Sequence, residues 1–473
     1  MKNPRSIGLR SGLPAPLLML LMALLGGCAG NAAYHDGPPA DCHNPDSSDV
    51  CARSYYQQHE NFDLAFVEYS ERGNAFSDER VKEVLARIES HATASGAVVV
   101  VFVHGWKHNA SEDDQNLLDF KRTLSILKGT GAVRDRRLIG VYVGWRGASI
   151  DVTGLRNITY WDRKAVAEEV GKGGVTRLFL ELDRIDRLQP QSGTSGKNVL
   201  TFFGHSFGGA ITVSAASEVL SGRFVNRSEN GGGVAPLGDG IFIINPAIEA
   251  NQMLHLVESA LGKQRSGYPD KQNPVLISIS SEADWANHYF FPLGQTVGLL
   301  LTWKQTDLQR VYMHDRRPDH AKDNRVLKEE HLDTTTVGNF APFLTHYLKA
   351  SPEELETNFE LLGCEAAAEV CEPVGLTTLK GQPAIGSAFV PANYPLYFIR
   401  TDENVMCGHN DIFNDKVQAF LLAVVNDVIE RAWSPNNGGN GATILSKPAE
   451  LAESADRFFK QMIANREPRG CME

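Results

Sequence analysis

Short, uninterrupted runs of aliphatic residues alternate with helical stretches along most of this chain. The run Val98–Val103 contains five valines and one phenylalanine, which is typical of a strand buried on both faces of a sheet. Strands of this kind, separated by helices, predict an α/β fold with a mostly parallel sheet covered by helices on both faces. Further strands are expected at residues 63–69, 138–145, 199–203, 241–244, 275–280 and 396–400, and helices at 78–91, 113–127, 163–187, 206–221, 251–261 and 412–433.

The alternation of strands and helices breaks once, in a segment of mixed character. This segment runs from about residue 285 to residue 393 and includes the apolar run Phe290–Trp303. Long irregular segments inside a compact domain are usually functional, so we expect a cap or lid over one edge of the sheet, inserted before the last strand. The expected core is thereby divided into residues 51–284 and 394–473.

The first 27 residues have the layout of an export signal. A basic start is followed by the apolar run Leu13–Leu25, which is too short to span a bilayer comfortably. The sequence Leu25-Gly26-Gly27-Cys28 resembles the lipobox of bacterial lipoproteins. The resemblance implies cleavage before Cys28 and acylation of its thiol and its new amino group. An ordinary signal peptide followed by a chance cysteine is the alternative.

The residues after Cys28 bear on where the protein is held. Ala29 stands where an aspartate would be associated with retention in the inner membrane, so the resemblance implies anchoring in the outer membrane of a Gram-negative bacterium, facing the periplasm or the exterior. Residues 28–50 are rich in Pro, Asp, Gly and Ser and are expected to form a flexible tether between the anchor and the folded body.

Six cysteines remain once Cys28 is set aside, and an even number in an exported chain suggests disulfides. Loop length favours Cys42 with Cys51 and Cys364 with Cys371, which leaves Cys407 with Cys471, although 15 pairings exist for six cysteines. No Cys or Cys/His group has zinc-like spacing. With a formal net charge of −11, general nucleic-acid binding is not expected either.

A candidate nucleophile lies at the junction between an expected strand and an expected helix. Gly204-His205-Ser206-Phe207-Gly208 directly follows the strand at residues 199–203 and precedes a small-residue helix start. This context is the one in which a Gly-x-Ser-x-Gly pattern forms a nucleophile elbow, with the serine hydroxyl exposed at the strand end. A glycine-rich turn without chemistry is the alternative. His205 is expected to face away from the serine.

An oxyanion formed by attack of Ser206 requires hydrogen-bond donors. The backbone N–H of Phe207, the residue after the serine, is one candidate. The loop that begins His104-Gly105-Trp106 resembles the oxyanion loop of esterases and lipases, so the resemblance assigns the second donor to Gly105-Trp106, with the Trp106 amide favoured. Metal binding by His104 and His108 is a weaker interpretation, because the pair follows a strand and does not lie on a helix, where four-residue spacing would put both side chains on one face.

A serine nucleophile also requires a base and an acid that orients it. The strand at residues 275–280 leads into Ser281-Glu282-Ala283-Asp284, whose spacing favours Asp284 as the acid, with Glu282 as the alternative. The last strand leads into Gly408-His409, just before the final helix, which makes His409 the expected base. His346 has helix-like neighbours and is expected to be a packed or surface residue.

The order Ser206, Asp284, His409 resembles the α/β-hydrolase superfamily over about residues 97–285 and 394–433. The strings Val103-His104-Gly105-Trp106 and Val143-Gly144-Trp145-Arg146-Gly147 are similar to those of uncharacterised bacterial lipoprotein hydrolases. The resemblance implies a serine hydrolase, esterase-like or lipase-like, that cleaves carboxylic esters through an acyl-enzyme at the envelope, without a metal or organic cofactor. The alternative is a catalytically silent fold that serves as an envelope interaction module.

Residues near the expected site suggest substrate contacts. Arg146 follows a strand end, where it would pair either with an anionic substrate group or with an acid of the next helix. Trp106, Trp145 and Trp285 also follow strand ends and would form an aromatic rim for an acyl chain or an apolar alcohol, unless each packs in the core. The expected partners are thus an ester or lipid substrate and the membrane that holds the anchor.

Overall fold

Strand β4 (Ala97–Val103) lies in the interior of a sheet of 11 strands, and every one of its residues is buried. Alternate side chains point to opposite faces of the sheet, so Val99 and Val101 pack on one side while Val100 and Phe102 pack on the other. The computed structural model describes residues 32–43, 48–147, 160–191, 196–226, 232–261, 268–269, 272–292, 295–296, 309–313, 324–353, 355–364, 376–377, 393–433, 447–464 and 467–470.

The strands of the large sheet follow the order β1-β2-β3-β5-β4-β6-β7-β8-β14-β11-β12. Every neighbouring pair from β3 to β11 is parallel, whereas the pairs β2–β3 and β11–β12 are antiparallel. The other strands of the sheet are β1 (Ala40–Asp41), β2 (Tyr56–Gln58), β3 (Asp63–Glu68), β5 (Arg137–Gly144), β6 (Val199–His205), β7 (Gly240–Ile244), β8 (Leu276–Ser281), β11 (His346–Lys349), β12 (Glu360–Gly363) and β14 (Leu396–Thr401).

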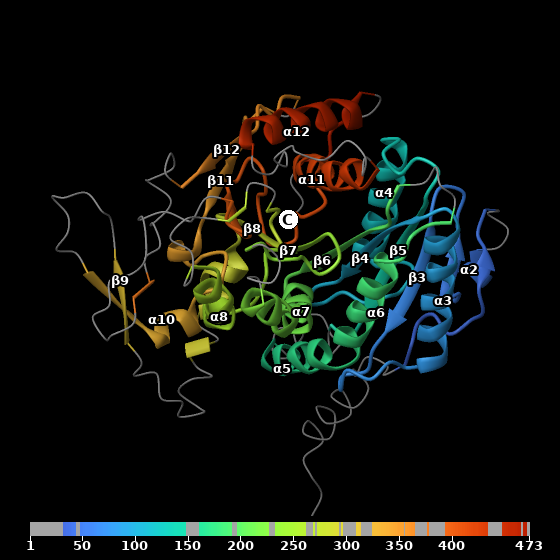
Figure 1. Cartoon of the computed structure of the whole chain (residues 1–473), viewed down its shortest axis with the longest axis horizontal. Helices are drawn as coiled ribbons and strands as arrows, with labels where there is room; N and C mark the ends of the chain where they lie inside the picture. Colours follow the sequence, from blue (N-terminus) through green and yellow to red (C-terminus); the bar gives the residue numbers. More distant parts are fainter. Residues whose placement is uncertain are drawn as a thin grey trace, which may run out of the picture.

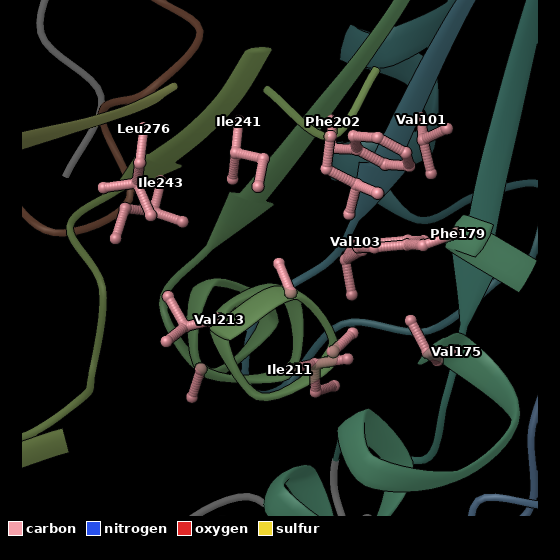
Figure 2. Packing of buried hydrophobic residues seen from close by; sticks show 14 of the residues in the cluster. Val101, Val103, Val175, Phe179, Phe202, Ile211, Val213, Ile241, Ile243 and Leu276 are labelled. Atoms are coloured by element: carbon pink, nitrogen blue, oxygen red, sulfur yellow. The ribbon is translucent and has the colours of Figure 1, made fainter. Parts of the chain in front are cut away.

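Helices cover both faces of the sheet, as the alternation of strands and helices predicts (Figure 1). One face packs against α3 (Asp78–Ala94), α5 (Tyr160–Val170), α6 (Thr176–Asp186), α7 (Phe207–Val225) and α8 (Ala250–Leu261). The other face packs against α4 (Gln115–Gly129), α11 (Asp415–Trp433) and α12 (Pro448–Ile463). Figure 2 shows part of the first core, where Ile211 and Val213 of α7 lie beneath Val103 and Ile243.

The order in which strands are added to the sheet reverses between β4 and β6: β5 lies on one side of β4, and β6 and β7 follow on the other. The connection after β4 leads to α4 on one face, and the connection after β6 leads to α7 on the opposite face. Loops that diverge in this way leave a crevice at the carboxyl ends of the strands, which is where open α/β sheets bind ligands. The residues in the loops between these strands and helices therefore determine which ligands or chemistry the carboxyl edge of the sheet supports.

The part of the expected tether (residues 28–50) that the structure describes includes a short strand and a short helix. β1 pairs in parallel with β2, and the short helix α2 (Ser48–Cys51) follows it. Cys42 and Cys51 form the expected disulfide, with Cα atoms 5.9 Å apart. The ring of His35 stacks on that of Phe66 at 3.4 Å between centroids, and His35 is 2% exposed. A disulfide and a buried ring hold in place a segment whose composition predicts a flexible chain.

The insertion at residues 285–393 differs from the expected cap as well. β11 and β12 extend the large sheet beyond β14, so this part of the insertion lies in the core layer. A small separate sheet is formed by β9 (Gln309–Met313), β10 (Asn324–Lys328) and β13 (Leu376–Thr377), with α10 (Glu329–Thr334) following β10. The apolar run Phe290–Trp303 lies mostly outside the described residues.

Two local predictions of helix need correction. His346 begins strand β11 rather than lying in a helix, because Tyr347 and Leu348 are buried on opposite sides of the sheet. The helix expected at residues 163–187 is interrupted by a π-helical turn, η3 (Gly171–Val175), in which Gly173 leaves helical geometry. Among the described residues, no helix is both long and apolar enough to cross a membrane.

We expect the face of the sheet that packs against α6 and α7 to determine much of the stability. Phe202 of β6 is fully buried, and its ring lies 4.2 Å from that of Phe179 on α6. The change Phe202→Ala should lower the free energy of unfolding by about 3–5 kcal/mol, because it leaves a cavity between sheet and helix. Leu180→Ala, at a side chain 44% exposed on α6, should change it by less than about 0.5 kcal/mol. Urea unfolding measures both, and equal losses would contradict the prediction.

Candidate active site

Ser206 occupies a sharp turn between β6 and α7. Its backbone has φ +55° and ψ −120°, in a region that non-glycine residues rarely adopt. Hydrogen bonds hold this conformation: its N–H donates to the Ile244 carbonyl at 3.1 Å, and its own carbonyl accepts from the Ala247 N–H at 3.1 Å. The β7 end thus fixes the strained residue from both sides.

Gly208 lets helix α7 approach the end of β4. A Cβ atom at this position would lie 2.1 Å from the Val103 carbonyl oxygen and 2.5 Å from that of His104. Because these contacts are with backbone, no side-chain movement could relieve them. Only glycine fits at position 208, which explains the second glycine of the Gly-x-Ser-x-Gly pattern.

Ser206, His409 and Asp284 lie in one hydrogen-bonded chain, although they follow three different strands. The hydroxyl of Ser206 lies 2.8 Å from Nε2 of His409, and Nδ1 of His409 lies 2.8 Å from Oδ2 of Asp284. A carboxylate accepts the Nδ1 proton, which leaves Nε2 to accept the proton of the serine. The arrangement can therefore activate Ser206 as a nucleophile by general-base catalysis.

Asp284 is held by a neighbour that sequence reasoning missed. The carboxylate is 1% exposed and accepts hydrogen bonds from Asn287, from its backbone N–H at 3.0 Å and from its side-chain amide at 2.7 Å. An aspartate often caps the start of a helix by accepting from the backbone N–H of the residue three positions later. This spacing of Asp284 and Asn287 is visible in the sequence. Glu282, the alternative acid, instead accepts a hydrogen bond from the Tyr347 hydroxyl at 2.9 Å.

Asn245 connects the loops that carry the acid and the base. It follows β7, has φ +44° and is fully buried. Its side-chain amide donates to the His409 carbonyl at 2.9 Å and to that of Gly408 at 3.2 Å, while its Oδ1 accepts from the Ser281 N–H at 2.9 Å. An asparagine directly after a buried strand next to the elbow strand was the signal available in the sequence.

His205, for which the expectation is that it faces away from Ser206, contacts the loop that carries His409. Its Nε2 donates to the His409 carbonyl at 2.9 Å, and the two rings lie 5.2 Å apart. Burial, reinforced by the nearby charge of His409 when that ring is protonated, lowers the pKa of His205 well below its usual value. A neutral His205 therefore positions the base through its backbone and adds no charge beside it.

His104 has a structural role, and the alternative of a metal pair is not supported. Its Nδ1 donates to the Gly105 carbonyl at 3.0 Å, and its Nε2 accepts from the Trp145 N–H at 3.1 Å, so both nitrogens are used within the protein. His108 lies 3.1 Å from a carboxylate oxygen of Asp114. Within the described ranges, no group of three His, Cys, Asp or Glu side chains is arranged to hold a metal.

The residues expected to form the oxyanion hole lie around Ser206. A Cβ atom added to Gly105 would be 3.1 Å from Cβ of Ser206, so this loop lies directly against the elbow. Phe207 is the first residue of α7 and fully buried, and its ring lies 6.3 Å from that of Trp106. The structure thus brings Gly105, Trp106 and Phe207 to the side of the nucleophile.

The other residues singled out in the sequence have varied positions. Arg146 forms an ion pair with Glu71 at 3.0 Å, so its acidic partner precedes it in the chain. Trp145 is 4% exposed and donates its indole N–H to the His104 carbonyl, whereas Trp285 is 58% exposed. Cys364 and Cys407 are in disulfides, and Cys28, Cys371 and Cys471 lie outside the described residues, so the pairings of these cysteines stay a prediction.

Comparisons with protein-family models, with curated proteins and with solved structures found no match to this chain. Its function is therefore inferred from the geometry of the site.

Gly208 and Gly222 provide a matched test of the close approach of α7 to β4. Both lie in α7, but a Cβ atom at Gly222 would meet nothing within 4 Å. Gly208→Ala should lower the free energy of unfolding by about 3 kcal/mol, through overpacking against backbone. Gly222→Ala should leave it unchanged or raise it by up to about 1 kcal/mol, since alanine favours helix. Chemical unfolding checks this, and a harmless Gly208→Ala would contradict the packing described above.

The buried histidines predict a loss of stability in mild acid. Burial lowers the pKa of His104 to about 4, whereas a histidine in the unfolded chain titrates near 6.5. Its contribution is therefore fully present above pH 6.5 and is lost as the pH falls toward 4, because only the unfolded chain binds the proton. A fall from pH 7 to pH 5 should lower the free energy of unfolding by about 2 kcal/mol through the titration of His104 alone.

The variant His104→Gln isolates this contribution, because an amide can donate and accept like the imidazole but does not titrate. Its free energy of unfolding, followed by urea denaturation, should depend less on pH than that of the wild type. An equally steep dependence would contradict the assignment to His104.

Proposed function

We propose that the chain is a serine hydrolase of the α/β-hydrolase superfamily that cleaves carboxylic esters. The observation that carries the proposal is the continuous chain from Ser206 through His409 to Asp284, with 2.8 Å at each step. The strained turn at Ser206 and the order of the three residues along the sequence support the same assignment. A catalytically silent fold would have no physical need for a serine with a strained backbone in contact with an oriented histidine.

In the proposed reaction, Ser206 Oγ attacks the ester carbonyl while Nε2 of His409 takes the hydroxyl proton. The negative charge on the carbonyl oxygen is stabilised by backbone N–H groups, for which Phe207 and Trp106 are the candidates. Collapse of the tetrahedral intermediate breaks the ester C–O bond, and His409 returns the proton to the leaving alcohol. Water, activated by the same histidine, then hydrolyses the acyl-enzyme, while Asp284 stabilises the imidazolium in both steps.

We also propose that the enzyme acts at a bacterial envelope, held there by acyl chains on Cys28. The lipobox-like sequence Leu25-Gly26-Gly27-Cys28 supports this location, as does a disulfide between Cys42 and Cys51, since such bonds form in oxidising compartments. An ester or a lipid of the same envelope is the proposed substrate.

A fluorophosphonate probe tests the proposed chemistry directly, because it labels only an activated serine. The wild type should label and should hydrolyse p-nitrophenyl butyrate, whereas Ser206→Ala should lose labelling and at least about 10³-fold in kcat. Ser221→Ala, in the same helix, serves as the matched control and should retain both. A folded wild type that neither labels nor hydrolyses a panel of esters would overturn the proposal in favour of an interaction module.

A further inference from the structure

Three aromatic side chains are exposed next to the candidate active site. Trp285, Tyr289 and Phe290 are 58%, 67% and 48% exposed, and they belong to the turn that follows Asp284 and the helical segment η5 (Ala286–Phe290). The rings of Trp285 and Phe290 meet edge to face at 4.4 Å between centroids, and Tyr289 lies 6.4 Å from Trp285. We call these three residues the aromatic cluster. Large exposed aromatics are unfavourable in water but favoured at the interface between lipid and water.

The N-terminal segment docks on the same edge of the sheet. The backbone N–H groups of Tyr34 and His35 each donate to the carboxylate of Glu68 at 2.8 Å. Glu68 is the last residue of β3, and its neighbour in the sheet, Gly144, is the last residue of β5. Since β3, β5, β4 and β6 are parallel, their carboxyl ends share the edge at which Ser206 stands.

The length of chain between Cys28 and the contact of Tyr34 with Glu68 limits how far the acyl groups on Cys28 can lie from this edge of the sheet. Tyr34 is six positions after Cys28, and a link of this length spans at most about 22 Å when fully extended. β5 has 8 residues and is therefore about 26 Å long. A chain that starts at the carboxyl end of β5 cannot carry the acyl groups past its amino end.

We propose that the carboxyl edge of the sheet faces the bilayer that holds the Cys28 anchor, with the aromatic cluster in the lipid headgroup region. Ser206 would then take its ester from that membrane, which names the substrate class as a membrane lipid. The inference rests on the proposed function for the acylation of Cys28 and the chemistry of Ser206. The short link and the exposed aromatics on one edge favour a bilayer as the occupant over a protein partner.

The first experiment measures the position of Trp285 and does not depend on catalysis. The full-length acylated protein is reconstituted on phosphatidylethanolamine and phosphatidylglycerol vesicles, with and without lipids brominated near the headgroup. The fluorescence difference between wild type and Trp285→Phe isolates the emission of Trp285, which brominated lipid should quench roughly twofold if the ring lies at the interface. The unacylated Cys28→Ser protein should show little quenching.

The second experiment links the aromatic cluster to catalysis on membranes. Tyr289→Ser with Phe290→Ser should reduce hydrolysis of a bilayer-embedded ester about tenfold, a loss of about 1.4 kcal/mol in transition-state stabilisation, and leave hydrolysis of a soluble short-chain ester unchanged. The matched control is Leu180→Ser with Val225→Ser, which removes exposed apolar side chains on α6 and at the far end of α7. This control pair should behave as wild type on both substrates.

The outcomes separate the two proposals. Equal emission of Trp285 in plain and brominated vesicles would overturn the membrane orientation and leave the aromatic cluster to a protein partner, even if Ser206 labels with fluorophosphonate. A wild type without an acyl group on Cys28, seen by mass spectrometry, would overturn it as well. Quenching of Trp285 without any fluorophosphonate labelling would support the orientation but overturn the proposed hydrolase and, with it, the lipid substrate.

Discussion

The contact between Gly208 and the backbone at the end of β4 is the constraint on which the site depends. With carbonyl oxygens of Val103 and His104 directly beside it, α7 begins as close to the sheet as backbone atoms allow. The chain between β6 and α7 then has room only for a sharp turn, and Ser206 takes up its positive φ. A strained backbone is retained when its surroundings over-determine it, and here the β7 end contributes two further hydrogen bonds.

Rigidity at the carboxyl edge comes from buried polar groups rather than from apolar packing alone. Asn245 bridges the loops after β8 and β14, and Asn287 bridges Asn245 to Asp284 with donations at 3.1 Å and 2.7 Å. Hydrogen bonds in a buried environment are costly to break, because a separated partner has no water to replace it. The base and the acid are thus held by neighbours that would have no part in the chemistry themselves.

Two segments of the described chain show how tertiary contacts override composition. Residues 32–43 have the proline and glycine content of a linker, yet His35 is buried against Phe66 and β1 joins the sheet. In the insertion, β11 finds a partner in β14, which follows it by some 50 residues. Local composition describes what a segment prefers in isolation, whereas the unpaired edge of a sheet offers backbone hydrogen bonds that change this preference.

The sequence by itself determined the parallel strands, most helices and the three residues that form the Ser206 chain, because buried strands and tight turns leave local patterns. The tertiary structure alone decided which side chains hold these residues. His409 lies 203 residues from Ser206. Asn245, which follows a third strand, β7, donates to the His409 carbonyl. No local sequence pattern predicts contacts between such distant residues. Periodicity shows which residues can be buried, while the partner that a buried polar group finds depends on how distant strands align in the folded sheet.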